Sequence, residues 1–219
     1  GEGKSSSLAA LINEINKDRA EHIVTIEDPI EFVYKPVKSV ISQREVGHDT
    51  QDWQIALKSV LREDPDIVLV GEMRDYETMA AAITVAETGH LVFGTLHTST
   101  VSQTMDRIID VFPADQQGQI QQQLAATVKA VASQRLLPRK GGGRIPAVEL
   151  MFANDAIRNL IREQKTHQID NVIQTSGSQE MMLMETHLGQ LVQQGQIEPE
   201  VGLRWAFRPG EMQRVLGRA

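Results

Sequence analysis

The chain has 219 residues, 41% of them hydrophobic and 23% charged, which is the composition of a folded globular domain with at most a small appendage. Its formal net charge of -7 gives no overall positive field that would attract DNA or RNA. The absence of cysteine excludes disulfides, thiolate metal sites and thiol catalysis, and the apolar runs are far shorter than the roughly 20 residues of a membrane span.

A glycine-rich stretch opens the chain, directly before an amphipathic segment. Gly3-Lys4-Ser5 supplies the last three positions of the phosphate-loop pattern G-x-x-x-x-G-K-[ST], so the motif is cut, which suggests a portion of a longer polypeptide. Apolar residues recur at intervals of three and four from Leu8 to Ile15, which predicts a helix over about residues 5–17. A serine-capped helix behind a glycine linker is the alternative, and this stretch alone does not separate the two.

Strands and helices are predicted to alternate over residues 22–98. The β-prone segments are His22–Ile26, Val37–Gln43, Asp66–Glu72 and His90–Thr98. A helix is expected to open at Thr50 and end at Asp64-Pro65, and Asp75 is expected to cap the next one. This alternation predicts a parallel α/β sheet, whose ligand site lies beyond the carboxyl ends of its strands.

The rest of the chain changes in character. The triple glycine at residues 141–143 is predicted to form a hairpin tip, and glutamine-rich Asp115–Leu124 a solvated helix. Helices are predicted at Ala156–Glu163, Thr166–Thr175 and Met181–Gln194. We therefore expect an α/β core over residues 1–150 and a small all-helical region over residues 151–219.

Carboxylates follow two of the predicted strands. Glu27, Asp28 and Glu31 come after the first, where a carboxylate could orient a water for phosphoryl transfer, although an ordinary acidic surface turn has the same composition. Glu72 follows the apolar run "IVLVG", as the metal-side carboxylate does in nucleotide hydrolases, but an aspartate is more usual where Gly71 stands.

Two histidines flank the last of these strands. His90 and His97 are seven residues apart, so they lie on opposite faces of any regular strand between them, which argues against a shared metal ion. A histidine at a strand end can also be a hydrogen-bonded structural residue.

Taken in order, these features resemble the secretion-superfamily ATPases, and within them the pilus-retraction branch. "TIEDPIEF" resembles the family's acidic box, "DPDIVLVGEMRD" its Walker B strand and "GHLVFGTLHT" its histidine box. "AIRNLIRE" at residues 156–163 is similar to a stretch characteristic of the retraction branch. The chain lacks the four-cysteine insertion usual in the extension ATPases, and the family's PAS-like front domain is absent from it.

The resemblance implies a RecA-like P-loop NTPase core with a parallel-rich sheet flanked by helices, and it implies ATP and Mg²⁺ as cofactors. The nucleotide-binding positions that it implies are those of the phosphate loop: Gly1, Glu2, Gly3, Lys4, Ser5 and Ser6. Mg²⁺ would be bound through Ser5 and Glu72.

The same resemblance implies catalytic roles. Glu31 would be the general base for the attacking water, Glu72 would hold the metal shell, and His90 and His97 would sense or position the γ-phosphate side. Glu27 and Asp28 are expected to support this polar cluster. Arginines would complete the charge stabilisation, and spacing does not choose among the candidates Arg44, Arg62, Arg74 and Arg107.

The function implied is that of an ATP-hydrolysing hexameric motor that powers type IV pilus retraction and twitching motility. Such a motor is cytoplasmic and peripheral at the inner-membrane pilus base, with an inner-membrane pilus platform protein as its partner and no nucleic acid. A RecA-like nucleic-acid translocase is the alternative enzyme, which the acidic balance and the 4% aromatic content disfavour. A GTP switch would need N-K-x-D, whereas "NKDR" has the wrong spacing. A non-catalytic scaffold, with surface carboxylates and a partner-binding helical tail, is the third alternative.

Overall fold

The computed structural model describes residues 1–176 and 180–217. Its residues form two compact units. The sheet unit comprises residues 4–97 and 111–116, and the hairpin unit comprises residues 1–3, 98–110 and those from 117 onward. This division differs from the boundary expected at residue 150, because the hairpin that precedes residue 150 packs with the C-terminal helices.

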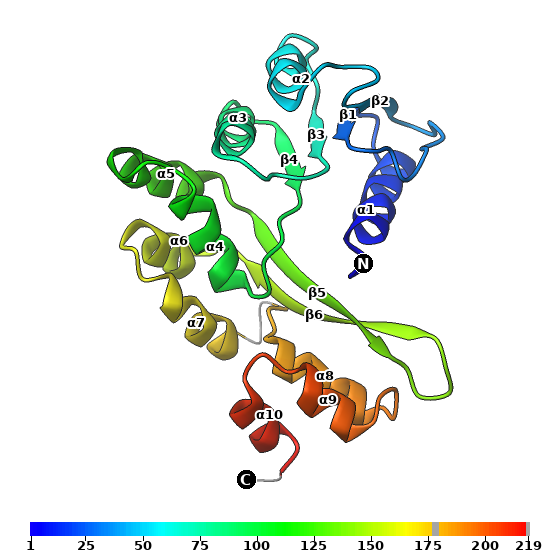
Figure 1. Cartoon of the computed structure of the whole chain (residues 1–219), viewed down its shortest axis with the longest axis vertical. Coiled ribbons are helices and arrows are strands. Elements are labelled where there is room, and N and C mark those ends of the chain that lie inside the picture. Colours follow the sequence, from blue (N-terminus) through cyan, green and yellow to red (C-terminus); the bar gives the residue numbers. More distant parts are fainter. Residues whose placement is uncertain (177–179, 218–219) are drawn as a thin grey trace. The chain divides into compact units, whose positions relative to one another are not determined.

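A four-stranded parallel sheet in the order β2-β1-β3-β4 forms the centre of the sheet unit (Figure 1). The strands are β1 (His22–Glu27), β2 (Val40–Glu45), β3 (Ile67–Val70) and β4 (Leu91–Gly94). In register, Ile23 of β1 pairs with Ile41 on one side and with Ile67 on the other. The predicted parallel α/β class is confirmed, and the carboxyl ends of all four strands meet at one edge.

Helices cover both faces of this sheet. The helix α1 (Lys4–Asp18) packs through Ile12 against Ile23 and Ile67. On the opposite face, α2 (Trp53–Val60) and α3 (Tyr76–Glu87) pack against Val24 and Val68. Because successive strand residues point to opposite faces, a strand covered on both sides must be apolar throughout, as β3 is.

The ends of these elements follow from local chemistry. Asp75 caps α3 as predicted, since its side chain accepts the N–H of Thr78. The cap of α2 is Asp52, which accepts the N–H of Ile55, and not Thr50 as expected. The strand β4 ends at Gly94 and is shorter than predicted, so the segment from residue 95 to residue 98 lies outside the sheet.

The hairpin unit contains an antiparallel hairpin of β5 (Ala130–Pro138) and β6 (Arg144–Phe152). Its tip is the triple glycine, as predicted, and all three glycines have positive φ. Leu137 and Ala147 of the hairpin are buried against Met184, Leu188 and the C-terminal helices. This shared core explains why the hairpin and the helices form one unit.

The remaining helices belong wholly or largely to the hairpin unit. They are α4 (Val101–Asp110), α5 (Ala114–Thr127), α6 (Asp155–Arg162), η1 (Thr166–Gln168), α7 (Ile169–Thr175), α8 (Met184–Gln193), α9 (Pro199–Trp205) and α10 (Pro209–Val215). Ile157 and Ile161 of α6 are fully buried, so the apolar face of "AIRNLIRE" lies in the core of its own unit. Among the described residues, no helix has the length and apolar character needed to cross a membrane.

Candidate functional site

Lys4 joins the first turn of α1 to the segment that follows β4. Its Nζ atom donates to the carbonyl oxygen of Leu96 at 2.8 Å and lies 3.3 Å from Nδ1 of His97. The first turn of α1 contains no acidic residue. Since the first N–H groups of a helix have no acceptor within it and the helix dipole is positive there, this end of α1 suits an anion such as a phosphate.

Glu72 lies directly beyond β3 and contacts two basic side chains. Its Oε1 atom is 2.8 Å from Nε2 of His97, and its Oε2 atom accepts from Nη2 of Arg74 at 2.6 Å. The hydrogen bond from Arg74 is the main cause that lowers the pKa of Glu72, and His97 adds to it. Glu72 is therefore ionised at neutral pH.

His97 bridges Lys4 and Glu72. A lysine ammonium only donates hydrogen bonds, so the Nδ1 atom that faces Lys4 acts as the acceptor. The proton of the neutral ring then lies on Nε2, which donates to Glu72. This chain of contacts joins three residues that are distant in the sequence at the carboxyl edge of the sheet.

The strand ends meet closely because residue 71 is a glycine. Its N–H donates to the carbonyl oxygen of Ile26 at 2.8 Å. A Cβ atom on Gly71 would lie 3.2 Å from both that oxygen and the Cα of Glu27, which is closer than most real contacts. This approach accounts for glycine where an aspartate is more usual. Thr95 adds a tie between β3 and β4, since its hydroxyl donates to the carbonyl of Gly71.

Glu27 stabilises the neighbouring strand ends. It is 8% exposed, and its Oε1 atom accepts from Thr25 at 2.7 Å and from Gln43 at 3.2 Å. The pKa of Arg74 is raised mainly by its hydrogen bond to Glu72. The negative charge of Asp28 adds to this rise. Glu27 is thus tied to β1 and β2 by hydrogen bonds, whereas Asp28 acts on Arg74 through its charge.

Glu31 lies in the irregular segment between β1 and β2. Its side chain is exposed, and it forms no hydrogen bond or ion pair within residues 1–176 and 180–217. The structure therefore does not bring Glu31 into contact with Lys4 or Glu72.

His90 does not join this group of contacts, although both histidines were predicted to act on the γ-phosphate side. It precedes β4, at the amino end of the strand, whereas His97 lies beyond the carboxyl end. Its Nδ1 atom is 3.0 Å from the carbonyl oxygen of Val85 and 2.9 Å from the hydroxyl of Thr88. Within this chain His90 therefore contacts polar groups at the C-terminal end of α3.

The phosphate-loop residues divide at the start of α1. Lys4, Ser5 and Ser6 form the first turn of the helix. Within the hairpin unit, the carbonyl oxygen of Glu2 accepts from Gln134 and its carboxylate accepts the N–H of Leu136. Gly3 has a φ of +80°, which a residue with a side chain rarely adopts.

Of the four candidate arginines, Arg74 contacts a carboxylate of the site. Arg44 instead forms an ion pair with Glu63 at 2.7 Å, and Arg62 and Arg107 are exposed.

Sequence reasoning did not single out Thr95, although it lies within the histidine-box stretch. It also missed the carbonyl of Leu96, because a backbone acceptor has no signature in the sequence.

Ser5 in the first turn of α1 and Glu72 directly beyond β3 carry the kinds of oxygen donor that a magnesium nucleotide requires. A serine hydroxyl and a carboxylate are the oxygen ligands that Mg²⁺ accepts, and this ion is usually held by one or two carboxylates together with substrate phosphates. No group of three or more histidines, aspartates and glutamates among the described residues could hold a metal ion alone.

Fold and site together define an α/β protein with a parallel sheet flanked by helices and a polar edge suited to a phosphate. The family model described as "Type II/IV secretion system protein" matches residues 1–200, and the chain belongs to this family. It is 53% identical over 207 residues to the "Twitching motility protein" of Neisseria gonorrhoeae, which covers 94% of this chain and 55% of that protein. It is also 51% identical over 200 residues to the type IV pilus retraction ATPase PilT of Pseudomonas aeruginosa, covering 91% and 58% respectively.

Solved structures agree with this assignment. A crystal structure of the pilus retraction motor PilT with bound ADP has a TM-score of 0.92 and 48% identity, covering 98% of this chain and 61% of that one. The ATPase DotB of Legionella pneumophila has a TM-score of 0.83 and 30% identity, covering 92% and 56%. The chain thus spans less than two thirds of the relatives that it matches.

Proposed function

We propose that this chain is the nucleotide-hydrolysing part of a pilus-retraction motor, which converts ATP and water into ADP and phosphate. The observation that carries the proposal is the contact chain from Lys4 through His97 to Glu72 at the carboxyl edge of the sheet. The relative named as a retraction ATPase and the related motor with bound ADP support the choice of nucleotide.

In this proposal each residue has a separate role. Lys4 and the first-turn N–H groups of α1 bind the phosphates, and Ser5 and Glu72 hold Mg²⁺ and its water shell. When bound, Mg²⁺ neutralises the charge that develops on the phosphate oxygens. His97 holds the side chains of Lys4 and Glu72 in place through its two ring nitrogens and faces the terminal phosphate.

Glu31 is proposed as the general base. It follows β1, whose carboxyl end lies beside that of β3, and its exposed carboxylate is accessible to a water molecule. Arg74 is the arginine best placed to add positive charge, because it already contacts Glu72. His90 is not given a role in binding phosphate within one chain.

We further propose a homohexamer that works in the cytoplasm, peripherally at the inner-membrane pilus base, against a pilus platform protein. Membership of the Type II/IV secretion family supports a ring assembly, and the names of the relatives support the pilus. The net charge of -7 favours a protein partner over nucleic acid.

Steady-state phosphate release by the complete protein tests the proposal. Lys4→Ala and Glu31→Ala should each lower turnover by at least about 10²-fold, the size typical for removing a positioned catalytic group. Lys17→Ala and Glu14→Ala are matched controls, because these two residues of α1 are exposed and pair with each other. Undiminished turnover in Lys4→Ala or Glu31→Ala would remove the role given to that residue.

Two further measurements separate the alternatives. Calorimetric titration with Mg²⁺ and ATP should show binding, whereas a nucleotide-independent scaffold would show none. A nucleic-acid translocase would hydrolyse ATP faster when single-stranded DNA or RNA is added, whereas we expect no such stimulation.

A further inference from the structure

Thr95 holds the backbone on both sides of Glu72. Its hydroxyl donates to the carbonyl oxygen of Gly71, and its own carbonyl oxygen accepts the N–H of Met73 at 3.0 Å. These two groups belong to the peptide bonds directly before and after the Cα atom of Glu72. Because a peptide bond is planar, holding both of these bonds fixes the direction in which the Glu72 side chain leaves the backbone.

The regular pairing of β3 with β4 ends before it reaches Glu72. The last paired residues of the two strands are Val70 and Gly94. Beyond this pair, the hydrogen bonds of Thr95 join the segment that follows β3 to the segment that follows β4. The contact between the two strands is thereby extended to the residue that carries the carboxylate.

Met73 is held by packing as well as by its hydrogen bond to Thr95. Its side chain packs against the apolar core that contains Val24 and Val68. A Cβ atom on Gly94 would lie 2.7 Å from Cε and 3.0 Å from Sδ of Met73, so the methionine lies close against the backbone of residue 94. Since Gly94 directly precedes Thr95, the packing and the hydrogen bond hold the same short stretch of chain.

The two residues after Thr95 complete a closed loop of contacts within the sheet unit. The carbonyl oxygen of Leu96 accepts from Nζ of Lys4 at 2.8 Å, and Nε2 of His97 lies 2.8 Å from Oε1 of Glu72. Thr95 thus contacts the backbone around Glu72, and His97, two residues later, contacts its side chain. The place of the ring relative to the carboxylate therefore depends on how residue 95 is bound.

We infer that Thr95 is a positioning residue, which sets the carboxylate of Glu72 opposite the imidazole of His97. This inference rests on the proposed nucleotide hydrolysis, in which Glu72 holds the metal shell and His97 faces the terminal phosphate. The hydroxyl of Thr95 is bound to the carbonyl oxygen of Gly71, so Thr95 touches neither nucleotide nor metal in this account. It acts through the backbone of Glu72.

The test uses the complete protein with Thr95→Val and Thr95→Ser. Valine has nearly the shape of threonine but no hydroxyl, so the carbonyl oxygen of Gly71 loses its donor. Turnover should fall about tenfold while KM stays within about twofold, since a small misplacement of a catalytic group is enough for this loss. Serine keeps the hydroxyl, so Thr95→Ser should retain turnover within about threefold of the parent protein.

Ser39→Ala is the matched control. Ser39 is buried directly before β2, and its hydroxyl donates to the carbonyl oxygen of Arg19 at 2.7 Å. The variant therefore loses the same kind of hydrogen bond in the same unit, at the amino ends of the strands. It should lower the thermal midpoint as Thr95→Val does, yet leave turnover within about twofold. Equal losses of turnover in the two variants would show that Thr95 is merely structural.

A spectroscopic readout without nucleotide separates this inference from the proposed function. The ring resonances of His97, assigned with His97→Gln and recorded by NMR, should shift in Thr95→Val in the same direction as in Glu72→Ala, and stay unchanged in Ser39→Ala. In the Glu72→Ala background, Thr95→Val should cause no further shift, because the carboxylate that it positions is already absent.

Unmoved His97 resonances in Thr95→Val, or a further shift in the double variant, would overturn the inference even if turnover falls. If the parent protein does not hydrolyse ATP, the proposed function fails, while these resonances still decide the positioning role. Should Thr95→Val not fold, Thr95→Ala removes the hydroxyl without placing a methyl group beside the carbonyl of Gly71, and the same shift is expected of it.

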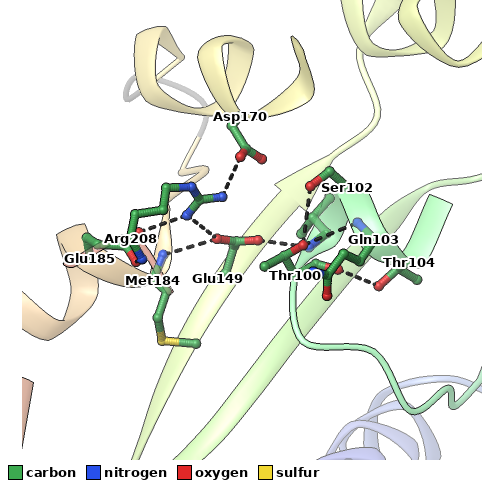
Figure 2. Close-up of polar contacts among 10 residues, drawn as sticks. Thr100, Ser102, Gln103, Thr104, Glu149, Asp170, Met184, Glu185 and Arg208 are labelled. Carbon is green, nitrogen blue, oxygen red and sulfur yellow. Dashed lines mark hydrogen bonds and ion pairs between the residues drawn. The ribbon is translucent and has the colours of Figure 1, made fainter. Parts of the chain in front are cut away.

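A buried polar cluster of the hairpin unit supplies a control for stability alone. Figure 2 shows Arg208 among three carboxylates: it lies 3.2 Å from Glu149 and 2.8 Å from Glu185, and it also binds Asp170. Arg208→Lys keeps the charge but loses the planar guanidinium, so the complete protein should unfold at a lower temperature. The His97 resonances should stay as in the parent protein. A shift as large as in Thr95→Val would mean that the ring reports a loss of stability, and would overturn the inference.

Discussion

The Nε2 atom of His97 lies 2.8 Å from Oε1 of Glu72, while the opposite ring nitrogen lies 3.3 Å from Nζ of Lys4. The imidazole thus lies between the cation of Lys4, at the start of α1, and the anion of Glu72, beyond the end of β3. One imidazole ring therefore contacts both the lysine and the glutamate.

His97→Ala should therefore lower turnover by about 10²-fold in the complete protein, the effect of removing one positioned donor. His48→Ala is the matched control, because the side chain of His48 is exposed and pairs with the adjacent Asp49. Phosphate release measured on both variants checks this prediction. A His97→Ala protein with parental turnover would contradict it.

Gly71→Ala should destabilise the sheet unit by about 1–3 kcal/mol, the usual cost of overpacking. The new Cβ would press on backbone atoms of β1, which cannot rotate away as a side chain can. Gly118→Ala provides the contrast, because its Cβ would meet nothing within 4 Å in α5, and alanine should stabilise that helix by about 0.5–1 kcal/mol. Urea unfolding should show a lower free energy of unfolding for Gly71→Ala and a higher one for Gly118→Ala than for the parent protein.

Arg158→Met should lower the free energy of unfolding by about 2 kcal/mol, the range for hydrogen bonds to a charged group. Its guanidinium donates to the carbonyls of Ala125, Ala126 and Val128, at the end of α5 where helical carbonyls lack partners. Arg162→Met is the control in the same stretch, since Arg162 is exposed and donates to the side chain of Asn159 one turn away. Equal unfolding midpoints for the two variants would argue against a capping role.

His187 should make stability fall as the pH drops below about 6.5. Burial lowers the pKa of His187, and its Nδ1 atom accepts the N–H of Val148, which requires an unprotonated nitrogen. The unfolded chain then takes up a proton at a pH where the folded chain does not, so acid favours unfolding, by at most about 1.4 kcal/mol for each pH unit.

Urea unfolding at pH 7.5 and pH 5.5 checks this prediction. His187→Gln should lose less stability than the parent protein between the two values, because a glutamine oxygen accepts the same N–H without titrating. His167→Gln, at an exposed position, should keep the parental difference. If His187→Gln shows the full parental loss, another group carries the pH dependence.

Much of the sheet unit was predictable because its signals are local. The apolar run at β3 reads as a strand covered on both faces, and an aspartate three residues before a free helical N–H, as at Asp75, is a cap by its own chemistry. The parallel arrangement then places Glu72 and the residues after β4 at one edge without further information.

What could not be predicted depends on where elements end and what they pack against. The separation of His90 from His97 follows from the end of β4 at Gly94, which the uninterrupted stretch from residue 90 to residue 98 conceals. The division between the units follows from the contacts of Leu137 and Ala147 with the C-terminal helices, and apolar strand residues look alike whichever core they enter. The tie between Glu149 and Arg208 joins residues 59 positions apart and left no local pattern.

The three left-handed glycines that join β5 to β6 offer a practical handle. Nothing lies within 4 Å of where a Cβ atom would stand at Gly141, Gly142 or Gly143, but all three have positive φ, so residues inserted between them strain the turn less than a substitution at any one of them. A short affinity peptide inserted in this turn would extend it into open space beyond the last paired residues of the hairpin, Pro138 and Arg144.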